Sequence, residues 1–513
     1  MRGGSAASSL LDGYREHGEA FLREVDGEFA FALWDRHERT LYLCRDSFGT
    51  KPLFFACDGR RLVAASEIRQ VLRSGVVVAS PNRSKLEADF GMGHSAPEET
   101  PFAGVYRVLP SQLLRFSPAL EWEGSVTWTP PTTVDRRRTE GDVIEELPRV
   151  LSRSIARRRW RKPLLTLSSG LDSAAVAAVV SSGDALRKQF SAAGRPRAIT
   201  LSYAGWDNDE TAEAARMAER LSIEHVVVDA TTTGPVESAG ELAEAFDQPY
   251  GGTGYEVPLL LREARRNGHE TAAMGLGAEY SWETMPRLAA DLFRVGSWGR
   301  LYREARDYAG QGSGRISGIF LHDVVRAWAG EGLRRLRHPG SRDAWESMMW
   351  RSKAGQMNGV QGGPPMEFLE QIGVHEGVEM VHPFLDREMV EFAFSTPPEL
   401  LGTLTDRKRL FGRAMDRLLP DPSWQRPKFP GPDGFVKSSL RGVAGWLGPM
   451  DRWQLPALLP LDAGTLETLR TLCAGETVES AVDAWTLVCR EFWLRRHFPG
   501  EAGGNEARSM AVA

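Results

Sequence analysis

One short polar stretch, residues 168–173, combines the residue types that phosphate chemistry requires. It reads Ser-Ser-Gly-Leu-Asp-Ser. It follows an apolar, β-prone run, residues 163–167, and precedes a run of small apolar residues, 174–180, which predicts a helix. A strand that breaks on Ser and Gly and re-enters a helix predicts an anion site, because the free N–H groups and the dipole of the helix N-terminus attract negative charge.

Each side chain of this stretch adds to the prediction. Gly170 lets the backbone approach a phosphate closely, and Ser168, Ser169 and Ser173 offer hydroxyls. Asp172 would repel a bare phosphate, so we expect a bridging Mg²⁺. The stretch lacks the lysine of a Walker loop and the glycines of a dinucleotide fingerprint. It resembles the PP-loop of enzymes that split ATP between the α- and β-phosphates and adenylate a substrate. The alternative is an ordinary strand–turn–helix with polar capping.

Length and composition indicate a globular chain of two or three domains. The 513 residues exceed one ordinary core, and 42% are hydrophobic and 26% charged. The net charge of −5 argues against a general nucleic-acid binder. We find no apolar run of about 18 residues and no apolar signal-peptide core after Met1, so we expect neither a membrane span nor secretion. The four cysteines show no metal-ligand spacing and fit reduced thiols in the cytoplasm.

Strands that alternate with helices surround the PP-loop-like stretch. Residues 197–203 and 225–229 predict further buried strands, and residues 145–160 predict an amphipathic helix before the first one. This pattern predicts an α/β fold with a doubly wound parallel sheet. Ligands bind such sheets at the carboxyl ends of the strands, so we expect Leu167 and Ser202 beside the nucleotide. A C-terminal helix, residues 481–498, should bury two tryptophans, at positions 485 and 493.

The N-terminal part predicts a helix, residues 10–25, and then a β-meander. Its sequence words at 26–32, 45–53 and 65–68 resemble the second half of the glutaminase domain of asparagine synthetases. In that family a Cys directly after the initiator Met attacks glutamine, whereas this chain has Arg2 and no first half of the domain. The resemblance therefore implies either a truncated, inactive α+β glutaminase-like (Ntn-type) domain or a different start site. The roles left for this domain are packing and partner docking.

The rest of the chain resembles the nucleotide domain of asparagine synthetases, a fold like that of the adenine nucleotide α-hydrolases. The similarity covers Ser169–Ser173, the strand ending at Tyr203, Asp209-Glu210, Asp247–Pro249 and Glu379–Asp386. We expect four segments: a glutaminase-like domain at 1–130, a Pro- and Arg-rich linker at 131–144, an ATP-binding domain at 145–498 and a disordered tail at 499–513. In the last matching segment, Glu379–Asp386, we expect a structural, ion-pairing role for Asp386.

The resemblance also implies the site residues. ATP would bind across nine residues: Leu167, Ser168, Ser169, Gly170, Leu171, Asp172, Ser173, Ser202 and Gly275. Asp172 and Glu279 would hold Mg²⁺, Glu279 standing where the family has Asp. Lys428, in the word Arg-Pro-Lys, would contact the α-phosphate and the developing charge. Glu379 would help to orient or deprotonate the attacking amine.

One departure points away from asparagine as the product. Leu276 stands where asparagine synthetases have a Glu and β-lactam synthetases a Tyr, and leucine can be neither acid nor base. The resemblance, with a Trp- and Arg-rich segment at 286–355 suited to a folded peptide, favours a lasso peptide cyclase. Such an enzyme adenylates a side-chain carboxylate of a core peptide and joins it to the N-terminal amine.

The expected partners are the linear precursor peptide, a leader-peptide-binding protein and a leader protease. Three alternatives remain: an ammonia-using asparagine synthetase-like enzyme, a β-lactam synthetase-like small-molecule cyclase, and a non-catalytic binding subunit. Glu279 and its neighbour Tyr280 keep the last of these open, because they depart from the family's pattern at the metal position.

Overall fold

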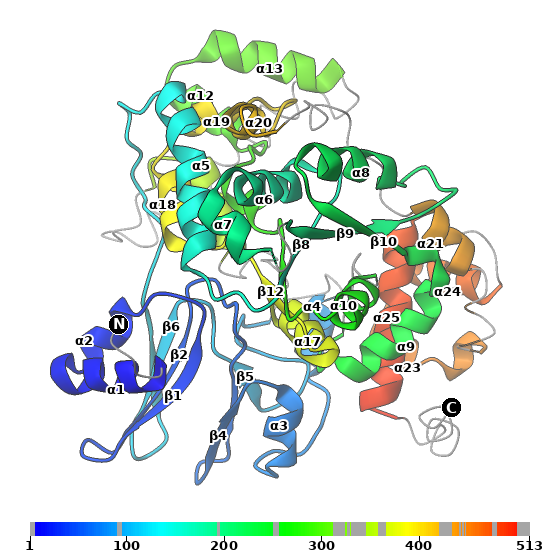
Figure 1. Cartoon of the computed structure of the whole chain (residues 1–513). Helices are drawn as coiled ribbons and strands as arrows, with labels where there is room; N and C mark the ends of the chain where they lie inside the picture. Colours follow the sequence, from blue (N-terminus) through cyan, green and yellow to red (C-terminus); the bar gives the residue numbers. More distant parts are fainter. Residues whose placement is uncertain are drawn as a thin grey trace.

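The structure is a computed structural model of the chain. It describes residues 6–89, 95–191, 195–249, 256–310, 324–325, 329, 345–357, 366–419, 433–440, 443, 446, 448–474 and 480–499. A smaller N-terminal part, rich in strands, lies against one side of a larger part built around a parallel sheet (Figure 1). No helix within the described ranges is long and apolar enough to cross a membrane.

Two antiparallel sheets make up the N-terminal part. The first has the order β1-β2-β6-β7 and the second the order β4-β3-β5. Buried apolar side chains such as Leu43, Phe55 and Phe116 pack together between them. The strands are β1 (Ala30–Asp35), β2 (Thr40–Arg45), β3 (Phe54–Cys57), β4 (Leu62–Ala65), β5 (Val105–Arg107), β6 (Gln112–Phe116) and β7 (Trp122–Val126). The helices are α1 (Ala6–His17), α2 (Glu19–Glu24), α3 (Ile68–Arg73) and α4 (Arg83–Asp89).

The single helix expected over residues 10–25 is wrong. The chain forms two helices that break at Gly18, whose φ of 65° lies in the left-handed region. Glycine adopts this conformation without steric cost, so it can end one helix and start the next in a new direction. The amphipathic pattern continues across the break because both helices contribute residues, among them Tyr14 and Leu22, to one apolar cluster.

A five-stranded sheet organises the larger part and confirms the expected fold class. Its order is β10-β9-β8-β11-β12, and every pairing is parallel. The strands are β8 (Pro163–Thr166), β9 (Arg197–Ser202), β10 (Glu224–Asp229), β11 (Thr271–Ala273) and β12 (Glu379–Val381). In the central strand, Leu164 and Leu165 are almost fully buried, as a strand covered on both faces requires.

Helices cover both faces of this sheet (Figure 1). On one side lie α5 (Glu140–Arg157), α6 (Leu171–Ser182) and α7 (Asp184–Gln189), and on the other α10 (Val257–Arg266) and α17 (Met366–Glu376). The remaining helices named below are α8 (Thr211–Arg220), α9 (Pro235–Ala245), α11 (Ala278–Ser281), α12 (Leu288–Arg294), α13 (Trp298–Gly310), α16 (Met348–Met357), α18 (Arg387–Phe394), α20 (Arg409–Met415), α21 (Asp433–Leu440) and α25 (Ala481–His497).

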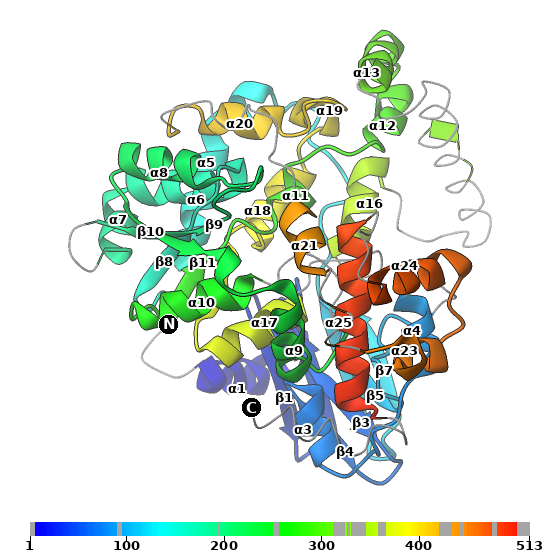
Figure 2. The same cartoon turned by 90° about the vertical axis from the view of Figure 1, so that its right-hand side faces the viewer.

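The C-terminal helix α25 connects the two parts. It packs against α9 and α21, and lies close to the N-terminal sheets in Figure 2. Trp485 and Trp493 are each 1% exposed, which confirms the expected core role. Phe102 of the N-terminal part packs edge-on against Trp493, with ring centroids 5.6 Å apart. The expected tail begins at residue 499, and residues 500–513 lie outside the described part of the chain.

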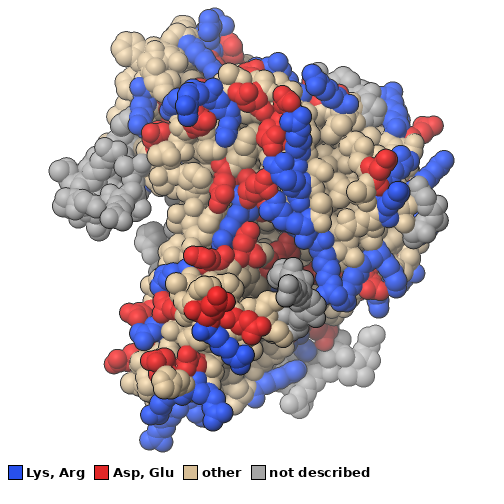
Figure 3. All heavy atoms as spheres, turned by 60° about the vertical axis from the view of Figure 1, so that its left-hand side comes forward, with Lys and Arg blue, Asp and Glu red and all other residues tan. Residues whose placement is uncertain are grey.

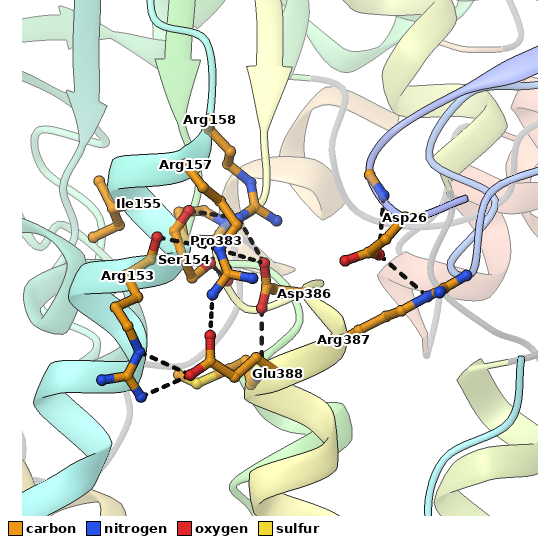
Figure 4. Close-up of polar contacts among 12 residues, drawn as sticks. Asp26, Arg153, Ser154, Ile155, Arg157, Arg158, Pro383, Asp386, Arg387 and Glu388 are labelled. Atoms are coloured by element: carbon orange, nitrogen blue, oxygen red, sulfur yellow. Dashed lines mark hydrogen bonds and ion pairs between the residues drawn. The ribbon is translucent and has the colours of Figure 1, made fainter. Parts of the chain in front are cut away.

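Ion pairs also join the two parts (Figure 4). Arg387, at the start of α18, binds Asp26 at 3.1 Å and donates to Ser47 Oγ at 2.7 Å. Arg158 lies 3.1 Å from Glu28 and 3.4 Å from Asp386. Asp386 also accepts from the backbone N–H of Met389 and so caps α18, which confirms its structural role. On the face drawn in Figure 3, positive and negative side chains interleave rather than gather by sign.

Candidate active site at the carboxyl edge of the parallel sheet

The turn that links β8 to α6 is folded by its own hydroxyls. Ser173 Oγ lies 2.9 Å from Ser168 Oγ and accepts from the Ser168 backbone N–H at 3.1 Å. Gly170 donates its backbone N–H to Ser168 Oγ at 3.1 Å. Leu167 and Leu171 are buried and anchor the turn from below, while the turn residues 168–170 are half-buried. The turn therefore has a fixed shape and an accessible surface.

One backbone N–H of this turn already binds a carboxylate. Ser169 donates to Oε2 of Glu210 at 2.9 Å. Gly170 is the N-cap of α6, so the turn lies at the positive end of the helix dipole. An N–H that donates to a carboxylate oxygen here can equally donate to a phosphate oxygen. The expected anion site thus has the donors that it needs.

Strand β9 supports the turn from the side. Thr200 Oγ1 donates to the Leu167 backbone oxygen at 2.7 Å and lies 2.7 Å from His225 Nε2. Ser202 ends the strand and donates to Asp209 Oδ1 at 3.3 Å. The structure therefore places Leu167 and Ser202 at the ends of neighbouring strands, as the doubly wound topology predicts.

Gly275 brings the loop after β11 into contact with the turn. A Cβ atom at this position would lie 2.7 Å from the Ser173 backbone nitrogen and 2.9 Å from the Asp172 carbonyl carbon. Backbone atoms cannot move away as a flexible side chain can, so any larger residue would push the loop off the helix. The close approach places the next residues of this loop, including Glu279, near the start of α6.

Asp172 faces a set of charged groups at this edge. Its carboxylate oxygens accept hydrogen bonds from Lys408 Nζ at 2.8 and 2.6 Å. Lys408 also lies 3.4 Å from Glu283, which pairs with Arg407 at 2.8 Å. Burial lowers the pKa of Lys408, but the charges of Asp172 and Glu283 outweigh it and raise that pKa overall. Burial raises the pKa of Glu279, and the nearby charge of Asp172 adds to the rise.

These groups fit a bound Mg²⁺. The Lys408 ammonium, a cation, contacts both carboxylate oxygens of Asp172. Glu279 lies close enough to Asp172 for the charge of that carboxylate to raise the pKa of Glu279. Magnesium is commonly held by one or two carboxylates together with substrate phosphates and water. No cluster of three or more His, Cys, Asp or Glu side chains able to hold a metal occurs in the described ranges. The oxygens of a nucleotide would therefore have to complete the coordination.

One of the two expected catalytic residues, Glu379, is not part of this cluster. Glu379 pairs with Thr271 at the amino ends of β12 and β11, the edge opposite the turn. There it binds Lys51 of the N-terminal part at 2.8 Å. Glu379 is the first residue of β12 and therefore lies at the amino edge of the sheet. This position does not support the expectation that Glu379 orients the amine. Lys428 lies outside the described residues.

Two charged residues at this edge, Lys353 and Glu283, were missed in the sequence, and Lys408 had been given no role. Lys353, on α16, is 2% exposed and donates from Nζ to the backbone oxygen of Glu279. Burial lowers the pKa of this amine to about 7, against the opposing charge of Glu283. The available signal was weak: Lys408 and Glu283 belong to no short motif. Leu276, next to Gly275, is half-buried and packs against the core.

A parallel sheet whose carboxyl edge carries this turn, with acidic and basic side chains around it, defines a PP-loop type of nucleotide site. Residues 146–495 match the asparagine synthase family, and residues 1–123 match a glutamine amidotransferase domain. The chain therefore belongs to the asparagine synthase family of ATP-dependent amide-forming ligases.

Several curated relatives support this assignment. Asparagine synthetase [glutamine-hydrolyzing] 3 of Bacillus subtilis is 23% identical over 89% of this chain and 77% of that protein. A putative asparagine synthetase of Mycobacterium bovis is 27% identical over 83% of this chain and 70% of that protein. The amidase chry2 of Gibberella zeae is 29% identical, but the match spans only 44% of this chain and 35% of the amidase.

Proposed function

We propose that this protein is an ATP-dependent lasso peptide cyclase. It would activate a side-chain carboxylate of a core peptide and close an isopeptide bond with the peptide's N-terminal amine, releasing AMP and pyrophosphate. The observation that carries the proposal is the pairing of a complete phosphate-binding turn with a half-buried leucine, Leu276, where amidating relatives have an ionisable side chain. Leucine at this position would supply neither an acid nor a base for handling ammonia.

In the first step, an oxygen of the peptide carboxylate attacks the α-phosphorus of ATP. An acyl–adenylate forms, and the bond to the β-phosphate breaks to release pyrophosphate. The Ser169 N–H at the start of α6 would donate to a phosphate oxygen, and Asp172 with Glu279 would hold Mg²⁺. The ion supplies charge neutralisation on the phosphates when it is bound. Lys408, which lies on Asp172, would contact a phosphate oxygen, and Lys428 would contact the α-phosphate.

In the second step, the N-terminal amine attacks the acyl carbon, and AMP leaves. Both reacting groups belong to one bound peptide, so holding them together contributes a large share of the rate. Two of the four cysteines are buried, which fits an amine that comes from the substrate. Burial raises the pKa of the Cys44 thiol to about 12, and Cys489 is buried as well, so neither is poised as a thiolate nucleophile.

The partners follow from the same proposal. The substrate would be the linear precursor core peptide, after a leader-binding protein has delivered it and a protease has removed the leader. Incubation of the protein with ATP, Mg²⁺ and a core peptide that carries an Asp or Glu should give a peptide lighter by one water, together with AMP. Pyrophosphate release with free aspartate and ammonium, and none with peptide, would identify an amidating enzyme instead.

A further inference from the structure

Lys353 places a buried amine directly beside the acidic turn of the site. Its side chain is 2% exposed, and Nζ donates to the backbone oxygen of Glu279. Within the described part of the chain, no carboxylate lies within 4.0 Å of this nitrogen. A lysine buried without a close counter-ion costs several kcal/mol, so a purely packing role would favour an apolar residue here.

The charged groups around Lys353 belong to the nucleotide site. Glu283 and Glu279 attract its charge, while Arg407 and Lys408 repel it. Glu283 pairs with Arg407 and Lys408, and Lys408 holds Asp172. A chain of contacts therefore runs from Lys353 through the residues after β11 to the first turn of α6.

The helix that carries Lys353 is fixed independently of the site. Asp291 on α12 caps it, accepting from Ser347 Oγ at 2.7 Å and from the backbone N–H of Met348 at 2.8 Å. Trp350 stacks on Phe394 at 4.5 Å between ring centroids and donates its indole N–H to the Thr396 backbone oxygen at 3.0 Å. The helix is thus a rigid support.

The turn that carries Glu279 has little internal support. Helix α11 has only four residues, Ala278–Ser281, and begins after Gly277, whose φ is 109°. The Glu279 side chain folds back to accept from the Gly277 backbone N–H at 2.9 Å. A one-turn helix cannot fix its own orientation, because too few hydrogen bonds oppose its conformational entropy. Contacts from neighbouring elements must do so, among them the packing around the fully buried Ala278 and Ser281 and the hydrogen bond from Lys353.

We propose that Lys353 is the positioning residue that holds the turn 277–281, so that the Glu279 carboxylate faces Asp172 and binds the nucleotide's metal ion. The inference rests on the proposed adenylation chemistry but not on the identity of the peptide. Residues that orient a metal ligand change metal affinity by about 10- to 100-fold when they are lost.

The test measures Mn²⁺ binding by electron paramagnetic resonance, in the presence of a non-hydrolysable ATP analogue. Lys353→Met keeps the length and bulk of the side chain but removes the donor. We expect it to weaken Mn²⁺ binding by about 10-fold. Lys353→Arg keeps a cationic donor, so its Mn²⁺ affinity should lie between those of the unaltered protein and Lys353→Met. Lys162→Met is the matched control, because Lys162 is exposed and binds Glu270 at the opposite edge of the sheet. The Mn²⁺ affinity of this variant should equal that of the unaltered protein.

A double substitution separates positioning from packing. If Lys353 acts through Glu279, Lys353→Met added to Glu279→Gln should cause no further loss of Mn²⁺ affinity. Equal affinity in Lys353→Met and the unaltered protein, or losses that add fully in the double variant, would overturn the proposal. Lys353→Gln, which is shorter but still polar, gives the same comparison if the Met variant does not fold. None of these readouts needs a peptide, so failure of peptide cyclisation remains a separate result.

Discussion

The two edges of the five-stranded sheet both gather charges, but they hold them differently. On the amino side, at the contact with the N-terminal part, Arg45 is 3% exposed and donates to three backbone oxygens and to Glu367. At the carboxyl edge, Asp172 and Lys408 are each about a quarter exposed, and the Lys408 amine donates to both oxygens of the carboxylate. A buried guanidinium with four hydrogen bonds is structural, whereas a lysine on a flexible stem can be replaced by a ligand.

The comparison assigns stability to one region and chemistry to the other. Burial alone would raise the pKa of Glu367, but the guanidinium groups of Arg107 and Arg45 outweigh it and lower that pKa to about 2. The Glu279 carboxyl at the other edge has the opposite shift, because burial beside Asp172 raises its pKa. Substitutions at the junction should therefore reduce stability, and substitutions at the carboxyl edge should reduce turnover.

The largest effect should come from Asp172→Asn. The amide keeps the shape of the side chain but cannot bind a metal ion with full charge. We expect AMP formation to fall by about 10²–10³-fold, in line with the loss of a strong electrostatic contact in a transition state. The midpoint of urea unfolding should stay close to that of the unaltered protein. Full turnover in this variant would remove the carboxyl edge from the chemistry.

Glu367→Gln should have the reverse profile. It leaves Arg45 and Arg107 buried without their counter-charge, which costs about 3 kcal/mol of unfolding free energy. AMP formation per folded molecule should be unchanged. Urea unfolding and an activity assay on the same sample measure the two quantities, and an unchanged midpoint would mean that the junction does not stabilise the chain.

His382, which directly follows β12, should make stability depend on pH. Burial, with the charges of Arg158 and Lys51, lowers the pKa of this imidazole to about 3, against about 6.5 in an unfolded chain. Unfolding therefore takes up a proton between these values, so stability is complete above about pH 6.5 and falls as the pH drops. The loss is about 1.4 kcal/mol per pH unit, or about 2 kcal/mol at pH 5.

Urea titrations at pH 5 and pH 7.5 check this effect, with His382→Gln as the variant that lacks the titrating group. The difference in unfolding free energy between the two pH values should shrink in the variant by about the same 2 kcal/mol. A difference of the same size in both proteins would show that another group titrates.

Glu379→Gln should have the smallest effect. The Glu379 carboxylate is 46% exposed and shares Lys51 with Glu370, so its ion pair contributes less than about 1 kcal/mol. ATP–pyrophosphate exchange should change by less than about twofold. A loss comparable to that of Asp172→Asn would return Glu379 to the catalytic residues.

The sequence predicted the elements whose signals are local. The apolar run into β8, the Ser-Gly break and the small residues of α6 identify a strand–turn–helix because each is set by near neighbours. The alternation of strands with helices then predicts a parallel sheet and the edge at which ligands bind. The helix break at Gly18 was missed, because the apolar pattern continues through it.

The charged shell of the site was not predictable in the same way. Lys408 lies 236 positions from Asp172, and Lys353 lies 74 positions from Glu279. No periodicity joins such residues, since only the folding of the sheet and α16 brings them together. Glu379 shows the converse. It belongs to a segment that matches the family, yet its carboxylate binds Lys51 of the N-terminal part.

The most direct test of the central claim follows an oxygen atom. A core peptide labelled with ¹⁸O in the reacting carboxylate is incubated with the protein, ATP and Mg²⁺, and the nucleotide product is analysed by mass spectrometry. Attack of that carboxylate on the α-phosphorus, followed by the amine's attack on the acyl carbon, must leave one ¹⁸O in AMP. We predict labelled AMP in step with the peptide that has lost water. Unlabelled AMP, or ADP as the nucleotide product, would contradict the adenylation mechanism.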